Sequence, residues 1–162
     1  MDDTPSVCCI IATLNRPNLV VEAVASVQED TYPKLDVVVV DDGSDKLSWE
    51  QASKELEGRQ RVKLLRRERS GGASSARNFG LSVVDSDFVT FMDDDDLHVP
   101  GKIQGQVELA LKHGCDFVTC TRFYYLAGGV RRTKGRIKEK LTLDNLWKRN
   151  EIVSVTPLVR TC

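Results

Sequence analysis

Short uninterrupted apolar runs punctuate the first hundred residues of the chain. One occupies residues 7 to 13, and others begin at Leu35 and at Phe88. Such runs are typical of strands covered on both faces, so we expect three buried strands of a parallel sheet. A weaker run at residues 61 to 66 alternates between apolar and polar positions, which predicts a strand nearer the edge of the sheet.

Between these runs the apolar positions recur with helical spacing. The spacing predicts helices over residues 18 to 29, 48 to 56 and 73 to 84, and a fourth over 101 to 112. Alternation of strand and helix along the chain predicts an α/β domain with right-handed crossovers.

The last third of the chain has a different pattern. The run CDFVTCTRFYYL, residues 115 to 126, predicts a strand that turns at Gly128 and Gly129 into a basic return segment, which we expect to be a solvated hairpin arm. The final run IVSVTPLVRTC is apolar and strand-like, whereas chain termini are generally polar. We therefore expect residues 1 to 162 to be a single, incomplete domain of a longer protein.

The composition of the chain limits the kinds of partner and the cellular setting that we expect for it. Lys and Arg number 23 against 24 Asp and Glu, so the chain lacks the basic field that would recruit nucleic acid. None of the five cysteines forms a C-x-x-C pair, and we expect reduced thiols in a cytoplasmic protein. No run approaches the ~18 apolar residues of a membrane span, and the acidic start MDDTPSV does not resemble a signal region.

Polar clusters follow three of the predicted strands. They are T-L-N-R at residues 13 to 16, D-D-G-S at 41 to 44 and D-D-D-D at 93 to 96. Each of the first two alone is equally typical of a helix cap or a turn. Ligands of parallel α/β sheets bind beyond the carboxyl ends of the strands, where these clusters would meet. Their coincidence therefore indicates a binding site along one rim of the sheet.

The four consecutive aspartates need a compensating charge. Adjacent carboxylates repel one another unless water or a cation screens them. A solvated acidic turn is the alternative, but this run begins inside an apolar strand. Magnesium is usually held by one or two carboxylates together with substrate phosphates. The aspartates therefore predict a metal-bound diphosphate.

The segment SGGASSARNFG, residues 70 to 80, also indicates a phosphorylated ligand. Its two glycines allow close approach of the backbone, and the helix that follows offers free N–H groups at its start. Arg77 lies one turn into this helix and offers a fork of donors to a base or a phosphate. The segment matches neither the P-loop nor the Rossmann dinucleotide fingerprint.

In their order, the motifs VCCIIATLNRP, VVVVDDGSD, SGGASSARNFGL and FVTFMDDDDLHVP resemble the nucleotide-binding half of a family-2 glycosyltransferase. The resemblance runs from about Val7 to about Val107. It implies the GT-A fold, an α/β domain with a mostly parallel, Rossmann-like sheet flanked by helices. Residues 7 to 100 would form the half that binds nucleotide and metal, and residues 101 to 162 would begin the acceptor-side half.

The resemblance also implies an activity. A family-2 enzyme transfers a sugar from a nucleotide-diphospho-sugar, usually a UDP-sugar, to the hydroxyl of a saccharide or other acceptor. The implied reaction is metal-dependent, inverting and hexosyltransferase-like.

Individual positions carry the family's roles over to this chain. Thr13 and Asn15 would line the base pocket, Asp42 would accept from the uracil ring, and Arg77 would contact the nucleotide. The aspartate run falls on the family's D-x-D region, in which Asp95 would bind the Mn²⁺ or Mg²⁺ ion that bridges the diphosphate. Asp93 or Asp94 would face the ribose or the donor sugar, and Asp96 would complete the rim of the site. Leu14 stands where the family commonly has an aromatic residue, so stacking on the base is lost there.

The catalytic base is expected beyond Cys162. The family places the carboxylate that accepts the acceptor's proton in a later acidic motif, and no matching motif occurs in this sequence. Glu139, Asp144 and Glu151 are the nearest candidates, but Glu139 lies in a basic stretch and Asp144 resembles a helix cap. We therefore expect these 162 residues to bind a nucleotide diphosphate with metal without transferring sugar.

Other classes fit the sequence less well. A nucleotide-sugar-binding fragment without turnover is the main alternative, and a sugar nucleotidyltransferase is disfavoured because its glycine-rich basic first loop is absent. The two histidines are not expected to be ligands. We expect His98 to be a loop residue and His113 to lie in the C-terminal capping region of a helix beside Gly114.

Overall fold

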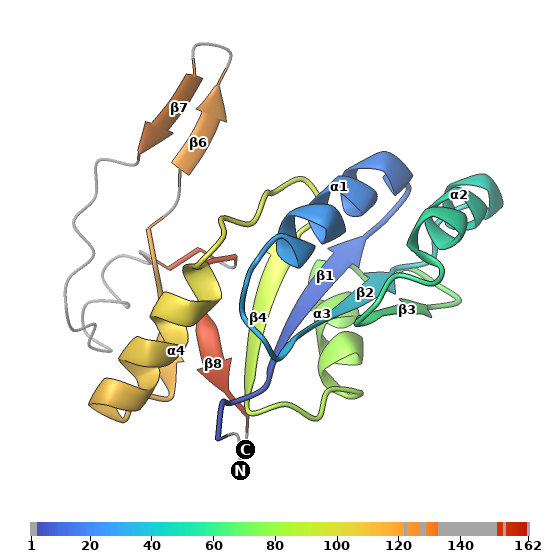
Figure 1. Ribbon diagram of the computed structural model, residues 1–162. Helices are drawn as coiled ribbons and strands as arrows, with labels where there is room; N and C mark the ends of the chain where they lie inside the picture. The colour runs from blue at the N-terminus through green and yellow to red at the C-terminus, as the bar shows by residue number, and fades with distance from the viewer. Residues whose placement is uncertain (1–2, 122, 127–128, 133–151, 154, 162) are drawn as a thin grey trace.

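The computed structural model describes residues 3–121, 123–126, 129–132, 152–153 and 155–161. Six strands form one sheet in the order β3-β2-β1-β4-β8-β5 (Figure 1). Its members are β1 (Val7–Thr13), β2 (Leu35–Asp41), β3 (Val62–Arg66), β4 (Phe88–Asp93), β5 (Phe117–Val118) and β8 (Leu158–Arg160). The first four pair in parallel, with β3 at the edge, as the apolar runs predicted.

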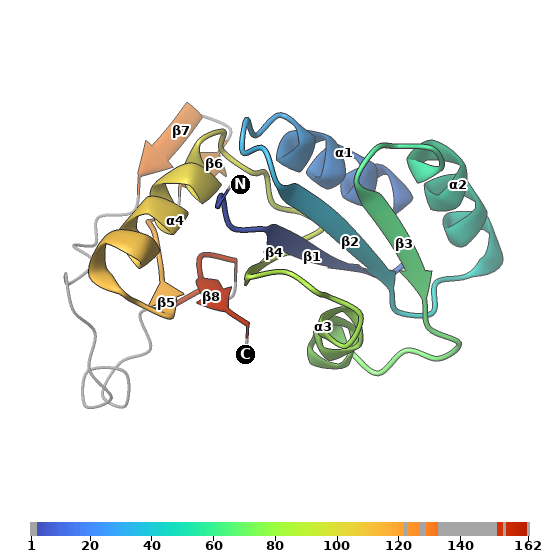
Figure 2. The ribbon, with the colours of Figure 1, turned by 60° about the horizontal axis from the view of Figure 1, so that its bottom comes forward.

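Among the described residues, four helices cover the two faces of this sheet. Figure 2 shows α3 on one side and α1, α2 and α4 on the other. Each lies within three residues of its predicted bounds: α1 (Pro17–Gln28), α2 (Lys46–Leu56), α3 (Ala73–Leu81) and α4 (Lys102–His113). Gly114 ends α4 in the left-handed conformation, with a φ of 60°, directly after His113. The expected place of His113 is therefore confirmed.

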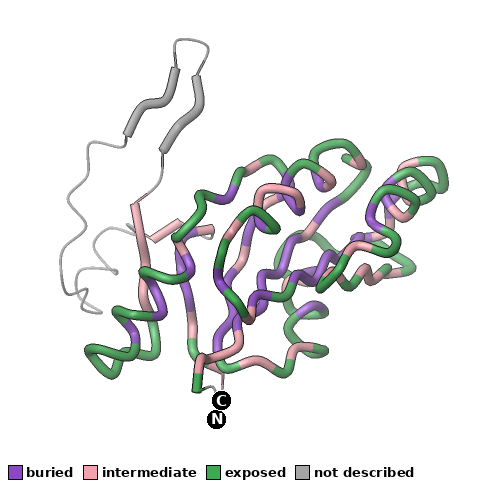
Figure 3. The backbone as a smooth tube through the Cα atoms, in the orientation of Figure 1, coloured by how far each residue is buried: buried purple, intermediate pink, exposed green. Residues whose placement is uncertain are grey.

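The core explains why the first apolar run is uninterrupted. Successive side chains of a strand point to opposite faces, and both faces of β1 are covered. Val7, Cys9 and Ile11 pack in the cluster that contains α1, α2 and α4, whereas Cys8 and Ile10 pack in the cluster that contains α3. The tube in Figure 3 accordingly shows the central strands buried and the outer faces of the helices exposed.

The last third of the chain departs from expectation in two ways. The described part of this run contains two short strands, β5 and β6 (Phe123–Leu126), and β6 pairs with β7 (Gly129–Arg132) in a separate antiparallel ribbon. The final apolar run contributes β8, which inserts antiparallel between β4 and β5. The sheet is therefore mixed. A run of three residues carries no signal for direction, which here follows from pairing with distant strands.

Four cysteines lie in the part of the chain that the structure describes. Cys8, Cys9, Cys115 and Cys120 are free, and burial raises the pKa of Cys8 and of Cys9 to about 12. The thiols of Cys8 and Cys9 are therefore protonated at neutral pH. Over the described ranges, the helices are too short and too polar to cross a bilayer.

Gly80 sets the distance between α3 and the sheet. A Cβ atom at Gly80 would lie 2.7 Å from Cγ2 of Ile10 and 3.1 Å from Cγ2 of Val40. We expect Gly80→Ala to lower the free energy of unfolding by roughly 1–3 kcal/mol, because overpacking outweighs the gain in helix propensity. Urea denaturation measures the difference.

Gly105→Ala in α4 is the matched control for Gly80→Ala. A Cβ atom at Gly105 meets nothing within 4 Å. The same substitution should therefore raise the free energy of unfolding by about 0.5–1 kcal/mol through helix propensity. Equal effects at the two positions would contradict the close packing of α3.

Candidate functional site at the carboxyl edge of the sheet

The order of the central strands brings the three polar clusters together. β1 lies between β2 and β4, and all three run in the same direction. Thr13 is in register with Asp41 of β2, and Ala12 is in register with Asp93 of β4. The carboxyl ends of these strands therefore form one rim, as the sequence predicted.

Asp94 joins the end of β4 to the end of β1. Its carboxylate is buried and accepts from Oγ1 of Thr13 at 2.7 Å and from Nη1 of Arg16 at 3.0 Å. The same Arg16 nitrogen donates to Oδ2 of the exposed Asp95 at 3.1 Å. The charges of Asp94 and then Asp95 raise the pKa of Arg16. Arg16 therefore supplies part of the positive charge that the aspartate run requires.

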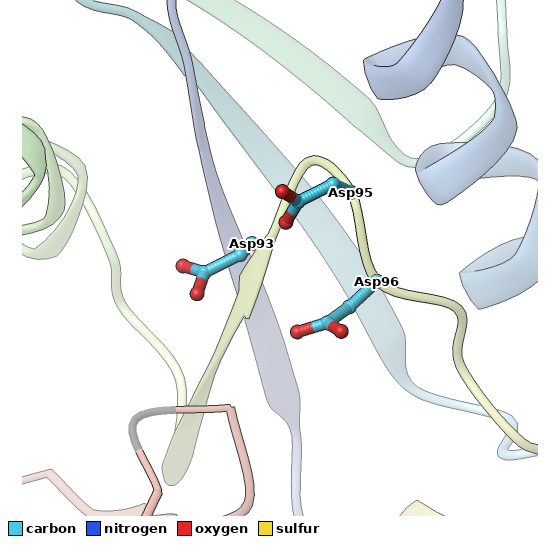
Figure 4. A group of neighbouring side chains, drawn as sticks. All are labelled: Asp93, Asp95 and Asp96. Atoms are coloured by element: carbon cyan, nitrogen blue, oxygen red, sulfur yellow. The ribbon is translucent and has the colours of Figure 1, made fainter. Parts of the chain in front are cut away.

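Three carboxylates of the run converge on one point. Asp93, Asp95 and Asp96 each offer an oxygen, and these oxygens all lie within 4.8 Å of one another. Figure 4 shows the three side chains projecting from the end of β4 and the turn that follows it. Asp93 also accepts a hydrogen bond from Nη2 of Arg77, one turn into α3. Clustered carboxylate oxygens are the donor set that Mg²⁺ and Mn²⁺ prefer, so these residues fit such an ion.

Asp42 anchors the glycine-rich segment to β2. Its buried Oδ2 accepts from Oγ of Ser70 at 2.7 Å, from the N–H of Gly72 at 2.8 Å and from the N–H of Gly71 at 3.1 Å. Arg67 donates to its other oxygen. Burial alone would raise the pKa of Asp42, but the bonds from Ser70, Gly72, Gly71 and Arg67 lower it overall. Asp42 is therefore an anion that fixes the loop leading into α3.

The turn after β1 is tied to the turn after β2. Asn15 has a φ of 55°, in the left-handed region that asparagine tolerates. Its N–H donates to Oγ of Ser44 at 2.8 Å, and its Oδ1 accepts from the N–H of Asp45 at 2.8 Å. Asp45 in turn caps α2 by accepting from the N–H of Ser48 at 2.9 Å. The first cluster does not cap α1 with a side chain, and the residue that caps α2 directly follows the second cluster. The two clusters are instead bonded to each other at the rim.

Four residues of this rim bond the predicted residues although the sequence pattern assigned none of them an individual role. They are the two arginines Arg16 and Arg67 and the two serines Ser44 and Ser70. Arg16, Ser44 and Ser70 lie within the predicted motifs, which was their only signal. Arg67 carried none, since its role depends on how the segment after β3 folds back over Asp42.

The histidine and acidic candidates fall elsewhere. His98 lies in the loop before α4, is buried and pairs with Asp30, as expected of a residue that is not a ligand. Glu139, Asp144 and Glu151 lie outside the residues that the structure describes. Over the described residues, the site is thus an edge of an α/β sheet lined by clustered carboxylates and arginines.

Comparison with known proteins identifies the family. The family model "Glycosyl transferase family 2" matches residues 8–158, so this chain belongs to glycosyltransferase family 2. Curated relatives include the glycosyltransferase GlyG of Streptococcus pneumoniae, 28% identical over 116 residues, which are 72% of this chain and 38% of the relative. Another is the Escherichia coli UDP-Glc:alpha-D-GlcNAc-diphosphoundecaprenol beta-1,3-glucosyltransferase WfgD, 33% identical over 119 residues, 73% of this chain and 46% of the relative.

Solved structures show the same fold. The mannosyltransferase PcManGT of Pyrobaculum calidifontis, in complex with GDP-Man and Mn²⁺, matches 74% of this chain and 36% of its own at 25% identity, with a TM-score of 0.66. TarS 1-349 of S. aureus matches 96% of this chain and 47% of its own at 22% identity, with a TM-score of 0.76. The fold is GT-A, as the motifs implied. The chain spans less than half the length of each of these proteins.

Proposed function

We propose that this rim binds the nucleoside diphosphate of a sugar donor, and that the protein transfers the sugar to an acceptor hydroxyl. The observation that carries the proposal is the convergence of Asp93, Asp95 and Asp96 beside Arg77 and the Asp42-anchored loop. Membership of glycosyltransferase family 2 supports sugar transfer as the reaction class.

The two ends of the donor have separate places in this proposal. Thr13, Asn15 and Asp42 form the nucleobase end, where Asp42 accepts from a ring N–H. Its four internal donors mean that a base must share the carboxylate with them or replace one. Arg77 contacts the nucleotide at the foot of α3.

The four aspartates have different roles at the diphosphate end of the donor. Asp94 is turned toward β1 and is already bonded to Thr13 and Arg16, so it supports the turn rather than the ligand. We assign the ribose or donor sugar to Asp93, the ion to Asp95, and the rim of the ion site to Asp96. When bound there, Mn²⁺ or Mg²⁺ supplies positive charge against the diphosphate leaving group.

The finer features of the reaction are also proposals. We favour UDP over other nucleotides, in keeping with the UDP-Glc in the name of the E. coli relative. The Pyrobaculum structure with GDP-Man and Mn²⁺ supports a nucleotide-sugar donor and a divalent ion. We propose an inverting transfer, in which a carboxylate takes the proton of a saccharide or other acceptor hydroxyl. Free thiols support a cytoplasmic location.

A nucleotide panel tests the proposal. Thermal unfolding is measured with UDP, GDP, ADP and CDP, each with Mn²⁺ and with a chelator. A ligand at ~100 times its dissociation constant stabilises the folded state by about 2.7 kcal/mol. We expect UDP with Mn²⁺ to give the largest shift. Absence of stabilisation by every nucleotide, with and without Mn²⁺, would overturn the proposed function.

A further inference from the structure

The loop that carries the aspartates runs along helix α1 (Figure 1). We define the aspartate loop as residues 94 to 101, between β4 and α4. Its near end is fixed at the start of α1 by the bonds of Asp94 to Thr13 and Arg16. Its far end is fixed at the end of α1, where the N–H of His98 donates to Oγ of Ser26 at 2.9 Å.

Asp30, just after α1, is the main anchor of the far end. Its Oδ2 lies 2.8 Å from Nε2 of His98 and accepts from the N–H of Gly101 at 3.1 Å. Its Oδ1 accepts from the N–H of Tyr32 at 2.9 Å. The side chains of Asp30 and His98 are 0% and 1% exposed. A buried carboxylate with these partners holds two points of the aspartate loop against the helix.

The apolar side chains in the middle of this loop are largely exposed. Leu97 and Val99, on either side of His98, are 57% and 54% exposed. The polar contacts of His98 and Gly101 therefore hold the far half of the loop. A buried His–Asp pair is weak evidence for a role in stability, because apolar residues of similar volume often stabilise the folded state equally well. Its presence here indicates a positional role.

The histidine is suited to a single directed bond. Nε2 of His98 lies 2.8 Å from Oδ2 of Asp30, and a carboxylate accepts, so Nε2 carries the proton of this bond. A neutral imidazole has one N–H, and placing it on Nε2 satisfies Asp30. Nδ1 of His98 has no partner among the described residues. Removing the Nε2 donor should therefore release the loop without breaking a second side-chain bond.

We propose that His98 and Asp30 are positioning residues that hold the aspartate loop along α1, so that Asp95 and Asp96 face the diphosphate and its ion. This inference rests on the proposed function for its consequence, but the contact itself can be tested without a ligand. Replacing a residue that positions the ligands of a metal ion typically weakens binding of the ion tenfold to hundredfold. An effect of that size is expected here.

The test compares His98→Phe, which keeps a planar ring without the N–H, with His98→Gln, which restores an N–H donor. Hydrogen exchange of the free protein should be faster at residues 95 to 99 in His98→Phe. Isothermal titration should show Mn²⁺-dependent UDP binding weakened about tenfold to hundredfold, with UDP binding in chelator unchanged. His98→Gln should recover most of both losses. The control is His113→Phe, at the exposed end of α4, which should match wild type.

Asp30→Asn provides a second route if His98→Phe fails to fold. It keeps the volume and weakens the charge-assisted bonds, so a smaller change in the same direction is expected. Wild-type exchange and wild-type Mn²⁺ dependence in the folded variants would overturn the inference. Equal losses with and without Mn²⁺ would also overturn it, because they indicate general destabilisation. If wild type binds no nucleotide with Mn²⁺, the proposed function fails, while the exchange rates still decide whether His98 holds the loop.

Discussion

Asp95→Asn is expected to abolish the Mn²⁺ dependence of UDP binding and to leave the fold intact. Asp95 lies on the exposed rim, and its side chain contributes to the carboxylate cluster rather than to the core. A neutral amide is a much weaker ligand for a hard divalent ion than a carboxylate. We expect the gain in UDP affinity that Mn²⁺ provides to fall by at least about a hundredfold. Replacing a residue that only positions a metal ligand costs up to about that much, and Asp95 is itself the proposed ligand.

Titration of UDP with Mn²⁺ and with chelator measures this loss. Affinity in chelator should change little, because Asp95 acts on the ion rather than on the nucleotide. Asp85→Asn is the control, since Asp85 is exposed and lies before β4 at the opposite edge of the sheet. Wild-type Mn²⁺ dependence in Asp95→Asn would remove Asp95 from the ion site.

Asp42→Asn should have the largest effect on the nucleobase end. Asparagine would place an amide N–H₂ opposite groups that are themselves donors, from Ser70, Gly71, Gly72 and Arg67. Bonds to a charged partner contribute more than neutral ones, and an unsatisfied buried donor is costly. We expect a loss of about 3 kcal/mol in the free energy of unfolding at pH 7, and weaker UDP binding.

The pH dependence of Asp42→Asn follows from the lowered pKa of Asp42. Because the folded-state pKa lies below the usual value of 3.8, the carboxylate stabilises the folded protein fully above that value. This contribution is lost as the pH falls through the folded-state pKa. The stability difference between wild type and Asp42→Asn should therefore shrink below about pH 4.

Urea denaturation from pH 7 to pH 3 gives the stability difference, and hydrogen exchange at residues 67 to 72 reports the loop. We expect faster exchange there in Asp42→Asn than in wild type. Asp36→Asn, an exposed position on the same strand, is the matched control. A variant with wild-type stability, loop exchange and UDP affinity would show that Asp42 neither anchors the loop nor contributes to the site.

The parallel half of the fold could be predicted because its signals are local. The apolar run of β1 reports burial on both faces, and the period of α1 reports one buried stripe. Strand ends then locate the rim, because parallel neighbours end at the same edge. The antiparallel β8 could not be placed this way. Its position depends on pairing with β4 and β5, which lie far from it in sequence.

The same limit applies to the site. That Asp42 and Asp95 lie on the rim follows from their positions after buried strands. Their partners do not, because Arg67 reaches Asp42 only through the fold of the loop after β3, and Arg16 reaches Asp95 only because β1 neighbours β4. The His98–Asp30 pair joins residues 68 apart and had no local signal. Long-range polar contacts are thus what the sequence pattern left open.

Paramagnetic broadening of amide signals by Mn²⁺ would test the central claim most directly. The spectrum of the isotopically labelled protein is recorded with UDP during a substoichiometric titration of Mn²⁺. We predict that the signals of Asp93 to Asp96 disappear first, that UDP strengthens the effect, and that Asp95→Asn removes it. Broadening centred on another part of the molecule, such as the opposite edge near Ser6 and Asp87, or broadening indifferent to UDP, would contradict a nucleotide-diphosphate site at this rim.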